Sequence, residues 1–169
     1  MIKFRKTPQP VIDPVKIERF LTRGVEKIFP SPEFVRDRLM KGERLTVYLG
    51  IDPTGPTLHM GHSIPLMKLR ELQDLGHEII LLIGDFTGMI GDPSDKTAAR
   101  KKLTRSEVLK NCERYKKQAS ALLNFSGPNK AVLKYNSKWL SKMNFGDVLE
   151  LASNMTVDQM LKRDMFDRR

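Results

Sequence analysis

Residues 46–83 read TVYLGIDPTGPTLHMGHSIPLMKLRELQDLGHEIILLI, and the expected fold class follows from their order. The stretch opens with the short β-rich run TVYLGI at 46–51 and closes with EIILLI at 78–83, which is apolar on both faces like a strand buried between two layers. Between the two runs, a leucine-rich helical pattern begins near Gly61 and stops before Gly76, a residue suited to the position after a helix end. Strand, helix and strand predict a right-handed βαβ unit, so we expect an α/β fold with a doubly wound parallel sheet.

Upstream of this unit, the sequence predicts two helices. Asp13 with Pro14, and Ser31 with Pro32, are typical pairs of a capping residue and a first helical residue. The apolar positions that follow them are Ile17, Phe20, Leu21, Val25 and Ile28 in the first helix, and Phe34, Val35 and Leu39 in the second, before Gly42. We therefore expect a helical leader over residues 1–44 and a second region over residues 45–169.

Downstream, the pattern predicts further helices and one more strand. Thr104 and Glu107 form a capping-box pair ahead of an apolar helix face made of Val108, Cys112, Tyr115, Ala119 and Leu122. The run AVLKY at 131–135 predicts a third strand, and Asn144 and Thr156 predict the starts of two more helices. Cys112 is then most simply a core residue.

Composition limits the kind of protein. The 169 residues are 40% apolar, enough for a buried core, and 30 Lys and Arg against 20 Asp and Glu give a net charge of +10, which favours an anionic partner. A single cysteine excludes an internal disulfide, and no apolar run reaches the length of a membrane span. The first ten residues lack the apolar stretch of a signal peptide, so we expect a cytoplasmic protein without membrane contact.

Two histidines lie where the first strand and its loop meet the helix. In TLHMGHS, His59 and His62 flank Gly61, and at the carboxyl end of a parallel strand such imidazoles can donate hydrogen bonds to phosphate oxygens. Gly61, without Cβ, lets a flat base approach the backbone. The same pair can equally be a helix cap or solvated surface. Only His77 and Cys112 remain as further soft ligands, and neither has the spacing of a zinc site, so we expect no metal site.

A glycine-rich segment, IGDFTGMIGDPSDK at 83–96, follows the second strand directly. On the same sheet edge as the histidines, it could place Asp92 against an ammonium group and Thr87 against another polar atom of one ligand. An ordinary turn would explain it too, and it lacks the order of a Walker loop.

The segment from residue 96 to residue 117 has nine basic residues and two acidic ones, a balance of +7. A solvated helix face accounts for its later members. Lys96 and Arg100 precede the helix, beside the expected ligand site, where flexible cations could meet phosphates.

Taken together, YLGIDPTGPTLHMGH at 48–62 and GDFTGMIGDPSDK at 84–96 closely resemble the amino-terminal catalytic half of bacterial-type tyrosyl-tRNA synthetases, which are class I synthetases. The resemblance covers roughly residues 45–169 and includes MTVDQMLKRDMF at 155–166. It implies a Rossmann-like catalytic domain that joins tyrosine to ATP and then passes the tyrosyl group to tRNA. Nothing in the sequence resembles the family's KMSKS loop or its anticodon-binding region, so we expect a fragment that is weakly active or inactive alone.

The resemblance also implies residue roles on the nucleotide side. His59 and His62 take the places of the family's signature histidines, with His59 and Thr54 near the departing phosphates and His62 and Gly61 near the nucleotide. Gly50 and Asp52 are expected to border the adenylate.

On the amino-acid side, the resemblance implies that the Tyr48 hydroxyl recognises the substrate phenol. Thr87 and Asp92 are expected to face the tyrosine, Asp92 towards its ammonium group. Lys96 and Arg100 match mobile-loop cations that hold pyrophosphate.

The implied ligands are L-tyrosine, ATP with its accompanying Mg²⁺, and tRNA(Tyr), with no tightly bound cofactor and a homodimer for the full-length protein. Two alternatives stay open. A small nucleotidyltransferase can share the HxGH pattern on a Rossmann unit at this length, although it does not explain Tyr48 or the glycine-rich segment. A noncatalytic RNA-binding or interaction module could keep the fold and the basic loop.

Overall fold

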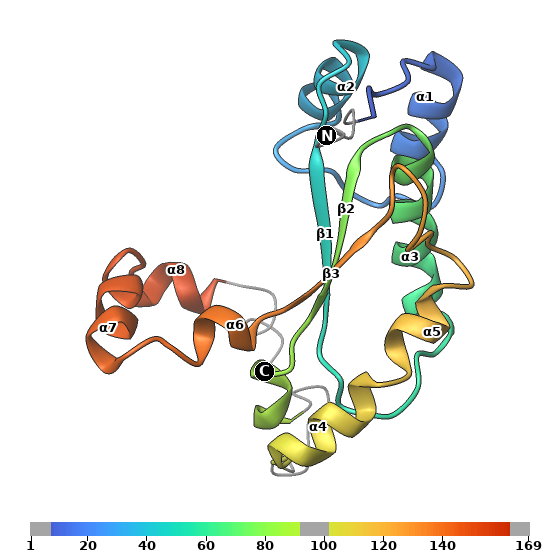
Figure 1. Cartoon of the computed structure of the whole chain (residues 1–169). Helices are drawn as coiled ribbons and strands as arrows, with labels where there is room; N and C mark the ends of the chain where they lie inside the picture. The colour runs from blue at the N-terminus through green and yellow to red at the C-terminus, as the bar shows by residue number, and fades with distance from the viewer. Residues whose placement is uncertain (1–7, 92–101, 163–169) are drawn as a thin grey trace, which may run out of the picture.

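The computed structural model describes residues 8–91 and 102–162, which contain a three-stranded sheet with helices along one side and at both ends (Figure 1). In chain order the elements are α1 (Pro14–Thr22), α2 (Pro32–Met40), β1 (Thr46–Ile51), α3 (Met60–Asp74), β2 (Glu78–Ile83), the 3-10 helix η1 (Thr87–Ile90), α4 (Arg105–Cys112), α5 (Tyr115–Ala119), β3 (Val132–Tyr135), α6 (Ser137–Leu140), α7 (Phe145–Ser153) and α8 (Val157–Leu161). The α/β class expected from the sequence is confirmed.

The strands pair in parallel in the order β1-β2-β3. β1 and β2 have the bounds expected from their apolar runs, and β3 begins one residue later than expected. Ile51 lies opposite Ile83, and Ile83 lies opposite Tyr135, so the three strands end at one level. The described strands advance across the sheet in one direction, as in one half of a doubly wound sheet.

Helices α3 and α5 lie on one side of the sheet (Figure 1), and the core forms between them and the strands. The leucines of α3 and the apolar side chains of β2 are its centre; its most buried members include Leu66, Leu81, Ile83 and Val108. β1 alternates between exposed and more buried residues, so Tyr48 and Gly50 share its exposed face.

The two leader helices begin as expected and pack onto the same core. Asp13 caps α1 through the amide of Lys16, and Ser31 caps α2 through the amide of Phe34. The sequence pattern extended the first helix too far, because α1 ends at Thr22 and Gly24 takes a left-handed φ of 65°. The division of the chain at residue 45 stays a prediction.

The helical region after the glycine-rich segment is interrupted, although its buried face is continuous. The capping box of Thr104 and Glu107 starts α4 as expected, but a turn at residues 113–114 separates α4 from α5. Val108, Cys112, Tyr115 and Ala119 are all buried across this break. The sequence analysis did not predict η1 or α6, which are only four residues long. The caps at Asn144 and Thr156 are confirmed for α7 and α8, which project from the body together with α6 (Figure 1).

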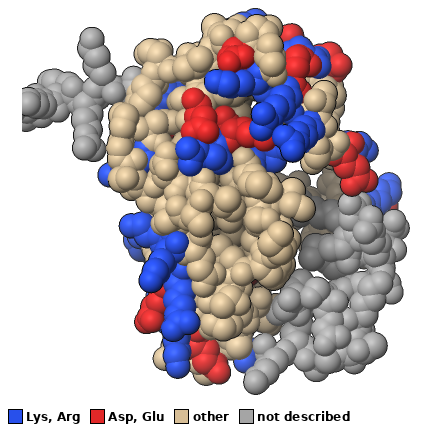
Figure 2. Space-filling model, turned by 90° about the vertical axis from the view of Figure 1, so that its right-hand side faces the viewer, with Lys and Arg blue, Asp and Glu red and all other residues tan. Residues whose placement is uncertain are grey.

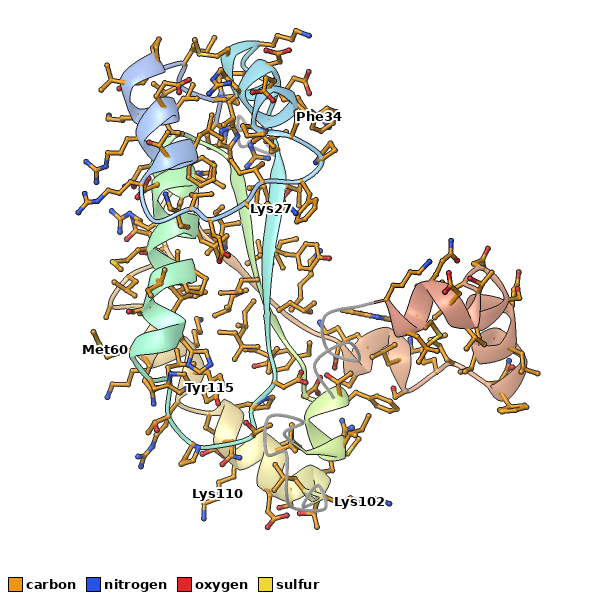
Figure 3. The ribbon with its side chains drawn as sticks, turned by 180° about the vertical axis from the view of Figure 1, so that it is seen from behind. Lys27, Phe34, Met60, Lys102, Lys110 and Tyr115 are labelled. Atoms are coloured by element: carbon orange, nitrogen blue, oxygen red, sulfur yellow. The ribbon has the colours of Figure 1, made fainter. Side chains whose placement is uncertain are left out.

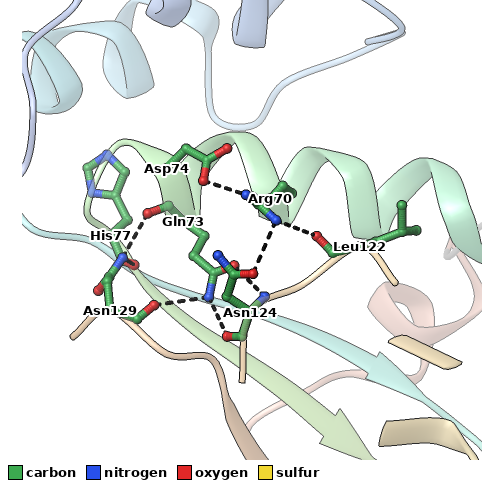
Figure 4. A network of polar contacts seen from close by, with 7 residues as sticks. All are labelled: Arg70, Gln73, Asp74, His77, Leu122, Asn124 and Asn129. Carbon is green, nitrogen blue, oxygen red and sulfur yellow. Dashed lines mark hydrogen bonds and ion pairs between the residues drawn. The ribbon is translucent and has the colours of Figure 1, made fainter. Parts of the chain in front are cut away.

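A polar network around the buried residues Gln73 and His77 holds the amino-terminal end of the sheet (Figure 4). The Gln73 amide donates to the carbonyls of Asn124 and Asn129 at 2.8 and 3.0 Å, and its oxygen accepts from the Asn124 amide. Asn129 in turn donates to the carbonyls of Gln73 and His77. Because these buried groups are hydrogen-bonded to one another, the turns before β2 and β3 are fixed in place.

Candidate active site

At the carboxyl end of the sheet, the loop after β1 and the segment after β2 are in direct contact. The hydroxyl of Thr87 donates to the Asp52 carboxylate at 2.7 Å. A Cβ added at Gly84 would collide with both the Asp52 carboxylate and the Thr87 hydroxyl, so only glycine fits there without displacing them. The loop that follows β1 and the glycine-rich segment therefore lie side by side at this edge.

The third strand contributes a residue that the sequence analysis missed. Asn136 directly follows β3 and is only 7% exposed. Its amide donates to the Thr87 hydroxyl at 2.9 Å, and its oxygen accepts from the Phe86 amide at 2.9 Å. Thr87 is thereby held between Asn136 and Asp52. The signal for Asn136 was available, because a polar residue just after a third parallel strand reaches the same edge.

His59 and His62 form the first turn of α3. His59 is the N-cap residue, and its Nδ1 accepts from the Gly61 amide at 3.1 Å. The Nδ1 of His62 accepts from the His59 amide at 3.2 Å, and the ring centroids lie 3.9 Å apart. A Cβ at Gly61 would lie 3.0 Å from the His59 ring, so glycine lets that ring fold back over the helix start.

These hydrogen bonds fix the tautomer of both rings. An Nδ1 that accepts a hydrogen bond carries no proton, so in each neutral imidazole the proton is on Nε2. Burial, and secondarily the charge of His59, lowers the pKa of His62, which keeps that ring neutral at pH 7. The capping role considered from the sequence is thus real, and it leaves two Nε2–H donors for an anion at a helix N-terminus.

The other expected site residues are distributed around this edge. Tyr48 is 68% exposed, and the space that a Cβ at Gly50 would occupy is open. Thr54 is half-buried, and its amide donates to the Asp52 carbonyl at 2.9 Å. Asp92, Lys96 and Arg100 lie outside the described residues.

An open pocket of about 640 Å³ adjoins the histidines. Both imidazoles line it, together with Gln118 and Leu122 from the far side. Figure 3 shows Met60 and Tyr115 at this end of α3. The pocket is large enough for part of a nucleotide.

The charges on the described surface are arranged in two ways. Figure 2 shows acidic and basic side chains mixed over the upper part of one face, and ion pairs such as Arg36–Glu18 at 2.6 Å and Arg70–Asp74 at 2.8 Å account for such mixing. The exposed cations of α4 and α5, among them Lys110, make no ion pair within the described part of the chain. Lys102 and Lys110 extend away from the body near α4 (Figure 3).

Cys112 and His77 are structural, and for Cys112 this confirms the core position expected from the sequence. Cys112 is 7% exposed, and burial raises the pKa of its thiol to about 11, so it stays protonated. His77 is buried, and its Nδ1 accepts from the Leu45 amide at 3.3 Å. Within residues 8–91 and 102–162 there is no group of three or more side chains suited to hold a metal ion, and no helix is long and apolar enough to span a membrane.

A family model described as "tRNA synthetases class I (W and Y)" matches residues 40–169. The chain belongs to this family. The chain is 46% identical over 155 residues to tyrosine–tRNA ligase 2 of Clostridium acetobutylicum, a match that covers 89% of this chain and 38% of that protein. It is 47% identical over 154 residues to the tyrosine–tRNA ligase of Moorella thermoacetica, covering 89% and 37%. The chain thus spans less than two-fifths of the length of these relatives.

Solved structures agree with the Rossmann-like fold of this chain. A C-terminally truncated mitochondrial tyrosyl-tRNA synthetase of Aspergillus nidulans matches with a TM-score of 0.72 at 24% identity, over 91% of this chain and 46% of that one. The tyrosyl-tRNA synthetase of Archaeoglobus fulgidus, solved with L-tyrosine, matches with a TM-score of 0.67 at 25% identity, over 86% and 42%. The family resemblance stated from the sequence motifs is confirmed.

Proposed function

We propose that this chain forms the ATP- and tyrosine-binding half of a tyrosine–tRNA ligase active site. Family membership and the names of the relatives support the reaction class. The observation that carries the proposal is the shared sheet edge, where Asp52 contacts Thr87. The loop that begins at Asp52 leads to α3, whose start presents two imidazole donors. The rival reading as a small HxGH nucleotidyltransferase does not account for the family match.

In the proposed reaction, a carboxylate oxygen of tyrosine attacks the α-phosphorus of ATP. The new bond joins that oxygen to phosphorus, the bond from phosphorus to the β-bridging oxygen breaks, and pyrophosphate leaves. No enzyme nucleophile is needed, so the protein contributes orientation and preorganised donors. The Nε2–H groups of His59 and His62 stabilise charge that develops on the phosphates, and Thr54 lies in the loop that leads to them. The open space beside Gly50 allows the nucleotide to approach the backbone. We assign Gly61 to the nucleotide side on the family motif, because in this structure the His59 ring lies against it.

On the amino-acid side, Tyr48 contacts the substrate phenol from the exposed face of β1. Asp52 and Thr87 offer polar atoms near the amino acid and the adenylate, and we assign Asp92 to the ammonium group. Lys96 and Arg100 hold the departing pyrophosphate. The adenylate then passes its tyrosyl group to the terminal adenosine of tRNA(Tyr), which releases AMP.

Several parts of the proposal concern the full-length protein. Mg²⁺ enters with ATP and neutralises its phosphates, while this chain supplies the hydrogen-bond donors around them. The absence of a tightly bound cofactor, a homodimeric state and a cytoplasmic location stay predictions. Sedimentation of the natural full-length protein tests the dimer.

Pyrophosphate exchange into ATP tests the reaction. In the natural full-length protein, we expect exchange that depends on tyrosine and is absent with tryptophan, phenylalanine or coenzyme precursors. Exchange with a coenzyme precursor would instead favour a small nucleotidyltransferase. Thermal unfolding with tyrosine tests the alternative of a noncatalytic RNA-binding module, because a ligand that binds only the folded state raises the melting temperature. A noncatalytic RNA-binding module would show no shift with tyrosine.

A further inference from the structure

Three side chains from the segment between β2 and β3 bind the loop that connects β1 to α3. Asn111 lies in α4, Tyr115 begins α5, and Gln118 lies one turn later, so they follow the i, i+4, i+7 spacing of one helix face. All three reach the loop of residues 53–58, which joins the end of β1 to the N-cap of α3. We call this set the anchoring face.

The contacts are hydrogen bonds to consecutive parts of the loop backbone. The Asn111 amide donates to the Pro53 carbonyl at 2.9 Å, and the Tyr115 hydroxyl donates to the Gly55 carbonyl at 2.7 Å. The Gln118 oxygen accepts from the Leu58 amide at 2.6 Å, and its nitrogen donates to the Pro56 carbonyl at 3.4 Å. These residues are 58 to 62 positions apart in the sequence.

Pro53 is buried and Leu58 packs against the core, but the loop backbone has few other hydrogen bonds. Pro53 and Pro56 have no amide hydrogen, and among the residues that the structure describes, the one backbone-to-backbone hydrogen bond donated from residues 53–58 runs from Thr54 to Asp52. Tyr115 is 2% exposed, so its hydroxyl cannot exchange the loop contact for water. The anchoring face therefore fixes the path of the loop between Asp52 and His59.

We propose that Asn111, Tyr115 and Gln118 are positioning residues for the adenylation step. They act through the loop, by setting where Thr54 and the His59 ring stand relative to the sheet edge. This inference rests on the proposed function, and it adds residues that act through the loop; Gln118 also lines the pocket beside the histidines. Preorganised donors stabilise a transition state only where their position is fixed, so a loosened loop lowers kcat more than it weakens binding of tyrosine.

The first measurement is structural and needs no activity. In the protein at its natural full length, Gln118→Ala removes the acceptor of the Leu58 amide, whereas Gln118→Glu keeps an acceptor there. We expect hydrogen exchange at Leu58 to be about tenfold faster in Gln118→Ala, with Gln118→Glu close to wild type and the amides of β2 unchanged. Unchanged exchange at Leu58 in Gln118→Ala would overturn the anchoring.

The second measurement is kinetic. Asn111→Ala and Gln118→Ala are expected to lower kcat of tyrosine-dependent pyrophosphate exchange about tenfold, with KM for tyrosine within about twofold of wild type and with rescue by Gln118→Glu. The matched control is Asn129→Ala, which removes comparable side-chain bonds to the Gln73 and His77 carbonyls at the other end of the sheet. We expect that control to lose stability and to keep its kinetic constants.

The outcomes separate the two proposals. A rise in KM with unchanged kcat, or an equal loss of kcat in Asn129→Ala, would overturn the positioning role. Wild-type protein without tyrosine-dependent exchange would remove the proposed function, while faster exchange at Leu58 in Gln118→Ala would still support the anchoring face.

Discussion

Thr87 donates its hydroxyl hydrogen to Asp52 while accepting a hydrogen bond from Asn136, so one threonine links the ends of all three strands. Thr87→Val keeps the shape but leaves the Asn136 amide without this acceptor. We expect the free energy of unfolding to fall by about 1–3 kcal/mol, because a buried donor then lacks a partner. Urea unfolding measures the loss. Thr87→Ser keeps the hydroxyl, and a loss as large as that of Thr87→Val would argue against this cause.

Two glycines at the same edge should respond differently to alanine. Gly84→Ala places a Cβ against Asp52 and Thr87, so we expect a loss of about 1–3 kcal/mol in unfolding free energy. Gly50→Ala meets no atom within 4 Å, so its stability should stay unchanged while KM for ATP rises. Denaturation and steady-state kinetics of both variants check the contrast. Unaltered ATP kinetics in Gly50→Ala would remove Gly50 from the nucleotide site.

Capping and chemistry can be separated at His59. His59→Ala and His62→Ala should lower adenylate formation by about 10²–10³-fold, with little change in tyrosine binding, because each loses one transition-state donor. His59→Asn supplies a good N-cap acceptor without the Nε2–H. We expect it to restore helix stability and not activity, as measured by melting and by single-turnover adenylate formation. Recovery of activity in His59→Asn would mean that His59 serves only as a cap.

Acid should weaken the fold through His77. Burial, and secondarily the charge of Arg44, lowers the pKa of His77 below its usual 6.5, so the unfolded chain takes up the proton first. Stability is therefore lost as pH falls through about 6.5 and stops changing from this cause below the folded-state pKa. His77→Asn keeps an acceptor for the Leu45 amide and removes the titration. Urea unfolding between about pH 7 and pH 5 should show a smaller decline for this variant than for wild type.

Because Tyr48 is exposed, a substitution there can test recognition of tyrosine without a change in the stability of the fold. Because its side chain is 68% exposed, Tyr48→Phe should change the unfolding free energy by less than about 0.5 kcal/mol. If its hydroxyl meets the substrate phenol, KM for tyrosine should rise several-fold while KM for ATP stays constant. A variant with wild-type tyrosine kinetics would exclude Tyr48 from the amino-acid site.

Local patterns predicted most of the fold because their signals are confined to neighbouring residues. β1 and β2 match their apolar runs to the residue, and Asp13, Ser31, Thr104, Asn144 and Thr156 all cap the helices that they were expected to start. The predicted helix ends were wrong where the apolar pattern continues beyond the last residue of the helix. Val25 and Ile28 continue the α1 spacing past Gly24, and the break between α4 and α5 leaves their common buried face intact.

The candidate site was predicted in part for a similar reason. The motifs identified the loops, and parallel strands bring such loops to one edge, which accounts for the contact between Asp52 and Thr87. The sequence pattern indicated only helix surface and core for Asn111, Tyr115 and Gln118. Their hydrogen-bond partners lie about sixty residues upstream. The spacing of neighbouring residues gives no information about a contact between residues so far apart in the sequence.

The anchoring face has a consequence for how the protein matures on the ribosome. The histidine loop is translated early, yet its three backbone tethers are supplied by residues 111–118, which emerge after a further sixty or so have been added. Until α4 and α5 have left the exit tunnel, the nascent histidine loop lacks these hydrogen bonds. Under the proposed function, the nucleotide side of the site is therefore completed only after residue 118 has emerged.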